Sequence, residues 1–397
     1  MNRLSAAITA LRESSTMAIT ARARELRESG EDVIGFGAGE PDFATPDHVV
    51  AAAAAACADP AQHHYTAVGG HPRLREAIAA RTLELSGLDY APSQVLVTNG
   101  AKHAVANTFA ALCGPGTEVL VPAPYWVTYP EIVRYCGATP VTVTPAPAQG
   151  FKVGVDDLEA ARTEATKALL FVSPSNPTGA VYDRDEARSI AAWAAESGIW
   201  VVTDEIYGRL VYGAAEFVSL PAQDPDLAAR SVVIDGVSKA YAMTGWRVGW
   251  MCGPPDVIEA ASRLQGHQTS NVANVCQAAA IAALEGPQQV VEDMRLAFDA
   301  RRRLMHSMLA AMDGVDCAEP AGAFYCFPDV EGLYGRRVAG RTIGSSADVA
   351  AALLEGARIA VVPGEGFGAP GHLRISYAVA DEQIAAGMQR MGDLLSV

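Results

Sequence analysis

A lysine placed just after a buried strand constrains this chain more than any other feature. The apolar run 231–235 is bounded by turn residues and predicts a buried strand. The stretch GVSKAYAMTGWRVG at 236–249 follows, with Lys239 among small residues and Arg247 eight positions later. Burial disfavours the charged ammonium and lowers the pKa of a lysine. The neutral amine that results is a nucleophile for carbonyl groups.

The arginine of this stretch indicates the second half of a ligand. Arg247 can hold a phosphate in its forked guanidinium. A ligand with an aldehyde for Lys239 and a phosphate for Arg247 fits both side chains, and pyridoxal 5′-phosphate is such a ligand. The alternative is that Lys239 is a surface loop residue and Arg247 a solvated strand flank.

The composition narrows the class of protein. A chain of 397 residues, half of them apolar, can bury a large core and form two domains. Its formal charge of −15 argues against nucleic-acid binding. The seven cysteines form no C-x-x-C pair and the eight histidines no metal spacing, so reduced thiols and no metal site are expected. We find no signal-peptide pattern and no apolar run long enough for a membrane, which predicts a cytoplasmic protein.

Predicted strands alternate with helices, and groups suited to a ligand follow the strands. Strands are expected at 95–98, 119–122, 168–172, 199–203, 231–235 and 372–378, helices at 18–28, 72–85 and 290–312, and an exposed loop at 340–346. Gly100, at a strand-to-helix turn, can direct backbone N–H groups at a phosphate. Asp204 ends a buried strand, where it can hold a protonated pyridine nitrogen or simply cap a helix. Two prolines fix the backbone of Asn176, and Arg374 lies between apolar residues, where an unpaired charge is costly.

Together these motifs resemble those of the class I and II aminotransferases, which are fold type I enzymes that use pyridoxal phosphate. The resemblance covers nearly the whole chain and includes GEPD at 39–42, NPTG at 176–179 and RISYA at 374–378. It departs from the family at Gly236, where some relatives carry a phosphate-binding serine.

The fold that the resemblance implies is α/β. A large domain, 46–285, would contain a mostly parallel seven-stranded sheet flanked by helices. Residues 1–45 and 286–397 would form a smaller α+β domain. The implied assembly is a homodimer with shared active sites, in which Tyr65 reaches the cofactor phosphate of the partner subunit.

The resemblance also implies a role for each site residue. The catalytic residues are Lys239, Asp204 and Tyr207. Cofactor contacts are implied for Tyr65, Gly100, Ala101, Lys102, Trp126, Asn176, Asp204, Tyr207, Ser238, Lys239 and Arg247. Substrate contacts are implied for Gly39, Trp126, Asn176 and Arg374, with Arg12 and Lys102 near a distal carboxylate. Asn176 would donate to the phenolic oxygen of the cofactor, and its bond to Pro177 is expected to be cis.

The implied reaction is a ping-pong transfer of an amino group between an L-amino acid and a 2-oxo acid. Arg12, Ser14, Ser15 and Thr16 match a segment near the distal carboxylate in bacterial aspartate and prephenate aminotransferases, so aspartate with 2-oxoglutarate is the expected pair. Prephenate and aromatic or specialised-pathway amino acids stay open as alternative substrates. A pyridoxal-phosphate lyase of the same fold stays open as an alternative activity. A nicotinamide dehydrogenase is disfavoured because the glycines at 35–39 lack the G-x-G-x-x-G spacing.

Overall fold

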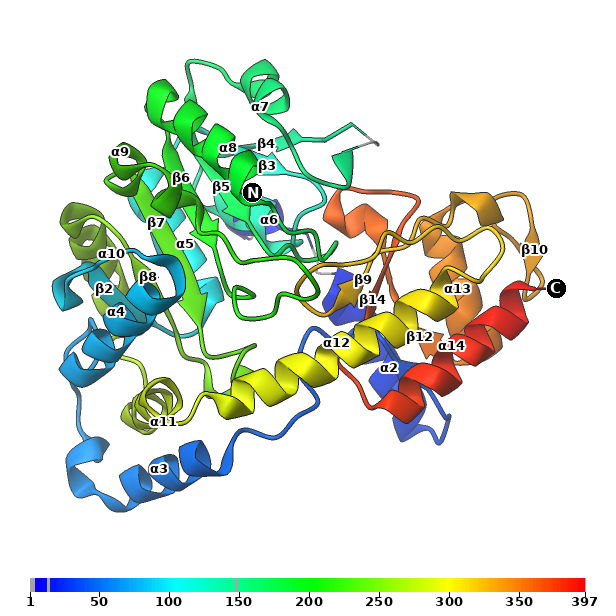
Figure 1. Ribbon diagram of the computed structural model, residues 1–397, viewed down its shortest axis with the longest axis horizontal. Helices are drawn as coiled ribbons and strands as arrows, with labels where there is room; N and C mark the ends of the chain where they lie inside the picture. Colours follow the sequence, from blue (N-terminus) through cyan, green and yellow to red (C-terminus); the bar gives the residue numbers. More distant parts are fainter. Residues whose placement is uncertain (1–3, 13–14, 147–148, 397) are drawn as a thin grey trace.

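A sheet of seven strands forms the centre of one part of the molecule (Figure 1). The computed structural model describes residues 4–12, 15–146 and 149–396. The strand order is β2-β8-β7-β6-β5-β3-β4, and only the two pairs that involve β8 are antiparallel. The strands are β2 Val95–Thr98, β3 Glu118–Pro122, β4 Thr139–Val143, β5 Thr166–Val172, β6 Trp200–Asp204, β7 Ser231–Gly236 and β8 Gly249–Cys252. The predicted α/β fold with a mostly parallel seven-stranded sheet is confirmed.

Helices cover both faces of this sheet, as its continuous apolar strands require. On β3, Val119 and Val121 pack on the face covered by α5 and α10, whereas Leu120 packs on the opposite face with α8. This alternation follows from the two-residue repeat of a strand. The helices of this part are α3 Asp47–Ala58, α4 Pro72–Ser86, α5 Ala101–Leu112, α6 Thr128–Tyr135, α7 Val155–Ala161, α8 Arg184–Ser197, α9 Pro225–Ala228, α10 Pro255–Gln268 and α11 Asn274–Glu285.

A second part combines segments from both ends of the chain. β1 pairs in parallel with β12, so the N-terminal segment joins the C-terminal one, and β13-β14-β9 form a three-stranded antiparallel sheet. Its elements are α2 Ser15–Glu28, β1 Ile34–Gly35, α12 Gln289–Leu309, β9 Tyr325–Cys326, β10 Arg337–Val338, β11 Arg341–Thr342, α13 Ser346–Ala357, β12 Ile359–Ala360, β13 Val362–Pro363, β14 Leu373–Ser376 and α14 Asp381–Leu395. The short helix α1 Ala6–Thr9 lies against α6 of the first part instead. The exact domain boundaries at 45/46 and 285/286 stay a prediction.

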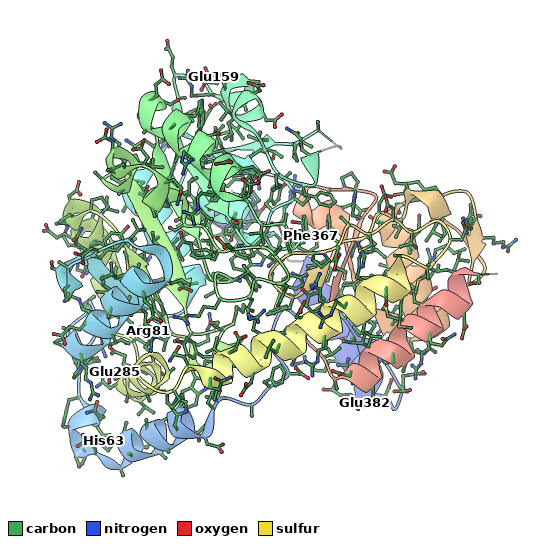
Figure 2. The ribbon with its side chains drawn as sticks, in the orientation of Figure 1. His63, Arg81, Glu159, Glu285, Phe367 and Glu382 are labelled. Atoms are coloured by element: carbon green, nitrogen blue, oxygen red, sulfur yellow. The ribbon has the colours of Figure 1, made fainter. Side chains whose placement is uncertain are left out.

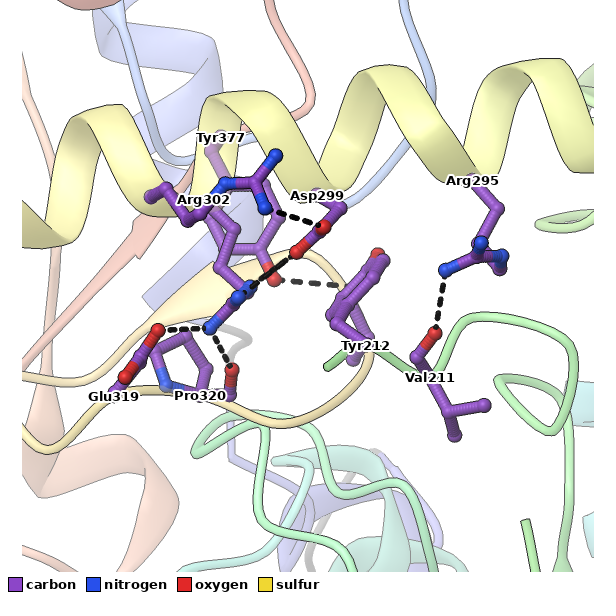
Figure 3. Close-up of polar contacts among 10 residues, drawn as sticks. Val211, Tyr212, Arg295, Asp299, Arg302, Glu319, Pro320 and Tyr377 are labelled. Carbon is purple, nitrogen blue, oxygen red and sulfur yellow. Dashed lines mark hydrogen bonds and ion pairs between the residues drawn. The ribbon is translucent and has the colours of Figure 1, made fainter. Parts of the chain in front are cut away.

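The long helix α12 crosses from one part to the other (Figure 1). Two of its side chains, Asp299 and Arg302, are buried beside the loop that carries Tyr212 (Figure 3). Arg302 donates to Asp299 at 2.9 Å, to Glu319 at 2.6 Å and to the carbonyl of Pro320 at 3.1 Å. Its guanidinium lies 5.6 Å from the ring centroid of Tyr212, which follows β6 in the first part. The network therefore ties α12 to both parts of the chain.

Three expectations about elements need adjustment. Helix α2 begins at Ser15 rather than at 18, and α12 runs from Gln289 to Leu309 rather than from 290 to 312. The exposed loop predicted at 340–346 is wrong in part, because Arg341–Thr342 forms β11 and Ile343 is buried. Ala339 and Gly340 both have positive φ, of 48° and 77°, which makes a two-residue hairpin turn between β10 and β11. Within the described ranges, no helix is long and apolar enough to cross a membrane.

Candidate active site

Lys239 lies in a turn after β7, where three separate segments meet. Its Nζ donates a hydrogen bond to the carbonyl of Gly39 at 2.7 Å and lies 5.9 Å from the ring centroid of Phe324. Burial lowers the pKa of Lys239 to about 8, although the nearby carboxylate of Glu40 opposes this shift. The amine is therefore more readily deprotonated than an ordinary lysine, and the surface-loop alternative is wrong.

Asp204 closes the buried strand β6 with its carboxylate inside the protein. It is 3% exposed, and burial raises its pKa. The hydroxyl of Tyr129 donates to its Oδ2 at 2.8 Å and the backbone N–H of Ile206 to its Oδ1 at 3.2 Å, and both bonds favour the ionised form. A turn rather than a helix follows Asp204, so the helix-cap alternative does not apply.

Arg374 on β14 and Asn176 after β5 contact each other directly. Nη1 of Arg374 donates to Oδ1 of Asn176 at 3.0 Å, and Nη2 donates to the carbonyl of Gly37 at 2.8 Å. Arg374 is 1% exposed, so it is not an edge-strand residue that extends to water. Because a guanidinium only donates, it fixes the amide oxygen of Asn176 and leaves Nδ2 for another acceptor. The expected cis bond between Asn176 and Pro177 is confirmed.

Aromatic rings surround this arginine. The guanidinium carbon lies 4.5 Å from the ring centroid of Tyr325 and 5.1 Å from that of Phe367. Phe367, labelled in Figure 2, belongs to the short helix Gly364–Phe367, and its carbonyl accepts the backbone N–H of Tyr125 from the other part of the chain at 3.0 Å. The hydroxyl of Tyr325 lies 2.9 Å from that of Tyr207. Arg374 is thus buried against aromatic rings at the junction of the two parts.

Gly100 and Arg247 form the opposite end of the site. Gly100 precedes α5 with a φ of 82°, and a Cβ there would meet Nη2 of Arg247 at 2.5 Å. Gly249 on β8 is packed as closely, since its Cβ would meet the backbone nitrogen of Ala101 at 2.3 Å. The first N–H groups of a helix have no acceptor within it. An exposed guanidinium and a helix N-terminus therefore meet here, a combination suited to an anion.

Lys102 and Trp126 lie next to these groups, and Ser238 precedes Lys239. The ring of Trp126 makes an edge contact with Tyr129, the partner of Asp204, with centroids 5.2 Å apart. Nζ of Lys102 lies 4.8 Å from the Trp126 ring centroid, and burial lowers its pKa, with a further contribution from Arg247. Ser238 is buried beside Lys239.

Two predicted residues lie apart from this cluster. Tyr65 is 91% exposed on a loop before α4. Arg12 is also exposed, and its backbone N–H donates to Glu131 at 3.0 Å. It lines a pocket of about 420 Å³ with residues of α6 and Gly366. Ser14 lies outside the described residues, and so do the side chains of Ser15 and Thr16.

Sequence reasoning missed four residues of the site: Tyr129, Phe324, Tyr325 and Phe367. A buried carboxylate such as Asp204 requires a hydrogen-bond donor, so the need for one was predictable. Its identity was not, because Tyr129 is 75 residues away along the chain. The aromatic residues at 324, 325 and 367 read as ordinary core positions.

The arrangement defines a class of protein, namely an α/β enzyme with an amine nucleophile and a buried carboxylate at strand ends. It also has a buried arginine and an anion-binding site formed by Gly100, the N-terminus of α5 and Arg247, here called the anion cradle. Comparison with known proteins agrees with this class. The profile of the family described as aminotransferase class I and II matches residues 31–391. The chain belongs to this family and is a fold type I aminotransferase.

Individual relatives are similar over their whole length. An aspartate aminotransferase of Streptomyces avermitilis is 56% identical over 394 residues, which cover 99% of this chain and 97% of that protein. An aspartate/prephenate aminotransferase of Cereibacter sphaeroides is 44% identical over 98% of this chain and 97% of its own. The aspartate aminotransferase of Thermus thermophilus, solved with maleate, has a TM-score of 0.93 at 38% identity, with 100% of both chains covered.

Proposed function

We propose that this aminotransferase uses pyridoxal 5′-phosphate and transfers the amino group of L-aspartate to 2-oxoglutarate in a ping-pong reaction. The observation that carries the proposal is Lys239, a lysine with a lowered pKa that is close enough to Asp204 and Arg374 for both charges to act on it. The names of the relatives support an acidic substrate, and maleate, which accompanies the Thermus enzyme, is a dicarboxylate.

The residues present fit the proposed cofactor. The N–H groups of Ala101 and Lys102 and the guanidinium of Arg247 suit its phosphate, and we propose that the hydroxyl of Ser238 also contacts it. The carboxylate of Asp204 suits its ring nitrogen, Trp126 its ring face, and Nδ2 of Asn176 and the hydroxyl of Tyr207 its phenolic oxygen. When bound, the cofactor supplies an aldehyde for the amine of Lys239 and a ring that withdraws electrons from the substrate Cα.

Each side chain of the site then has a separate role in the reaction. Arg374 and Asn176, with the backbone of Gly39, hold the α-carboxylate and orient the Cα–H bond. Lys239 accepts that proton as a base and returns it as an acid, for which a pKa of about 8 is well placed. Asp204 keeps its negative charge against the ring nitrogen, helped by the hydrogen bond from Tyr129.

The proposed distal-carboxylate contacts are Lys102 and Arg12. Lys102 lies over Trp126 at the edge of the site, and Arg12 belongs to the N-terminal segment beside α6. A basic residue here favours a dicarboxylic substrate by charge complementarity. Prephenate is the second candidate acceptor, because relatives such as the Cereibacter enzyme carry both names.

Assembly and location complete the proposal. In a homodimer with shared sites, Tyr65 would contact the cofactor phosphate of the partner subunit, which accounts for its 91% exposure in one chain. The seven cysteines of the chain are free thiols, which fits a reducing cytoplasm.

A panel of amino donors with 2-oxoglutarate and oxaloacetate tests the proposal. We expect the highest kcat/KM for aspartate, and values at least tenfold lower for tyrosine and phenylalanine. Pyruvate and ammonia release in place of amino transfer would indicate a lyase. A higher kcat/KM for aromatic donors would overturn the assignment of an acidic substrate.

A further inference from the structure

One buried amide contacts the backbone before the exposed Tyr65 and the side chain of the residue after it. Asn274, the first residue of α11, is 8% exposed. Its Nδ2 donates to the carbonyls of Gln62 at 2.9 Å and His64 at 2.7 Å, and its Oδ1 accepts the hydroxyl of Thr66 at 2.8 Å. A single side chain, 209 positions beyond Tyr65 in the printed sequence, therefore brackets that residue.

These contacts restrict the directions in which Tyr65 can point. The backbone of His64 is extended, with φ of −113° and ψ of 161°. Successive side chains of an extended segment point to opposite sides. The hydroxyl of Thr66 contacts Asn274, whereas its neighbour Tyr65 is 91% exposed, so the ring of Tyr65 does not pack on α11.

Two further buried amides support the same loop. Oε1 of Gln277 accepts the backbone N–H of His71 at 2.7 Å. Nε2 of Gln265 donates to the carbonyls of Val68 at 3.0 Å and Val97 at 2.9 Å. Val97 belongs to β2, which leads directly to Gly100 at the anion cradle. The loop of Tyr65 is thus braced against the same element that positions this chain's own cradle.

We propose that Asn274 is a positioning residue that fixes Tyr65 for the phosphate bound at the Gly100–Arg247 cradle of a second copy of the chain. This inference rests on the proposed sharing of sites between two subunits. An amide suits the task because it supplies two donors and an acceptor at once, whereas alanine supplies none and a carboxylate cannot donate. Loss of the amide frees the loop, so the hydroxyl of Tyr65 spends less time at the phosphate.

The first test measures pyridoxal-phosphate affinity by fluorescence titration of the cofactor-free protein. We expect Asn274→Ala and Tyr65→Phe each to raise the Kd about tenfold, the size of one lost hydrogen bond to a charged group. The double variant should be no weaker than Tyr65→Phe alone, because Asn274 acts through that hydroxyl. An additive loss, or an unchanged Kd for Asn274→Ala, would overturn the inference.

Two further variants control for folding. Gln389→Ala removes an exposed amide on α14 that contacts Asp393, and the Kd should stay unchanged. Thr66→Val removes one of the three contacts and leaves Asn274 intact, so a rise in Kd of about twofold is expected even if Asn274→Ala fails to fold. No change with Thr66→Val would also count against the inference.

The second test uses mixed dimers, isolated with two affinity tags. In a dimer of an Asn274→Ala chain and a Lys239→Ala chain, the site that retains its lysine receives Tyr65 from the chain with an intact Asn274. We expect that site to have the wild-type Kd and KM. A persistent defect would place the role of Asn274 within its own chain and overturn the inference. A second mixed dimer carries Tyr65→Phe in place of Asn274→Ala and tests the shared site separately from the role of Asn274. If its site that retains Lys239 does not recover the wild-type Kd, the sharing of sites between subunits is itself overturned.

Discussion

Nη1 of Arg374 lies 3.0 Å from Oδ1 of Asn176, so the residue proposed to bind the substrate carboxylate also orients the amide beside it. Arg374 is buried between Tyr325 and Phe367, which leaves its guanidinium little freedom to rotate. This geometry makes the planar fork, rather than the charge alone, the feature that recognises a carboxylate.

Arg374→Lys should therefore damage binding although it keeps the charge. We expect kcat/KM for aspartate to fall about 100-fold, or about 2.7 kcal/mol, mainly through a higher KM. Steady-state kinetics measures this, with the exposed Arg184→Lys as the matched control. An unchanged KM would show that Arg374 does not contact the substrate.

Lys239→Ala should abolish both turnover and the absorbance band of the imine between the lysine and the cofactor. The amine is the proposed attachment point and the proposed base, so kcat should fall at least about 1000-fold. Lys152→Ala, which removes a lysine paired with Glu186, is the control and should keep both properties. Retention of the imine absorbance and of activity by the Lys239 variant would refute the proposed chemistry.

The lowered pKa of Lys239 predicts how cofactor loading depends on pH. Only the neutral amine attacks an aldehyde, so the loading rate of the cofactor-free protein should rise with pH through a midpoint of about 8. Two pH units below this midpoint the rate should be about 100-fold lower than at the plateau. Glu40→Gln removes a charge that raises the pKa, so the midpoint should move down. A midpoint above 10 would mean that burial does not act on this amine.

Tyr129→Phe tests the contact that keeps Asp204 ionised. The hydrogen bond from Tyr129 lowers the pKa of Asp204 against the effect of burial, so its loss should raise that pKa. Protonated Asp204 cannot stabilise a positive ring nitrogen, and the acid limb of the kcat profile should move to higher pH. The variant should behave like the wild type well above that limb. An equal loss of kcat at every pH would indicate a packing defect instead.

The sequence predicts those parts of the site whose signals are local. Lys239, Asp204 and Asn176 each follow an apolar strand, and Arg374 is the charged residue of an apolar run, so short patterns were enough to place them. Tyr325 and Tyr207, whose hydroxyls lie 2.9 Å apart, are separated by 118 residues, and no local pattern joins them. The hairpin at Ala339 was missed for a different reason, since alanine seldom adopts the positive φ found there.

The anion cradle provides a final prediction, because it depends on the absence of a side chain at Gly100. A Cβ there would meet Arg247 at 2.5 Å, and the φ of 82° is unfavourable for alanine. Gly100→Ala should therefore displace the guanidinium, raise the Kd for pyridoxal phosphate at least about tenfold and destabilise the fold by about 1–3 kcal/mol. Gly114→Ala is the control, since nothing lies within 4 Å of its Cβ position. Fluorescence titration and thermal unfolding measure both effects, and equal behaviour of the two variants would show that Gly100 does not shape the phosphate site.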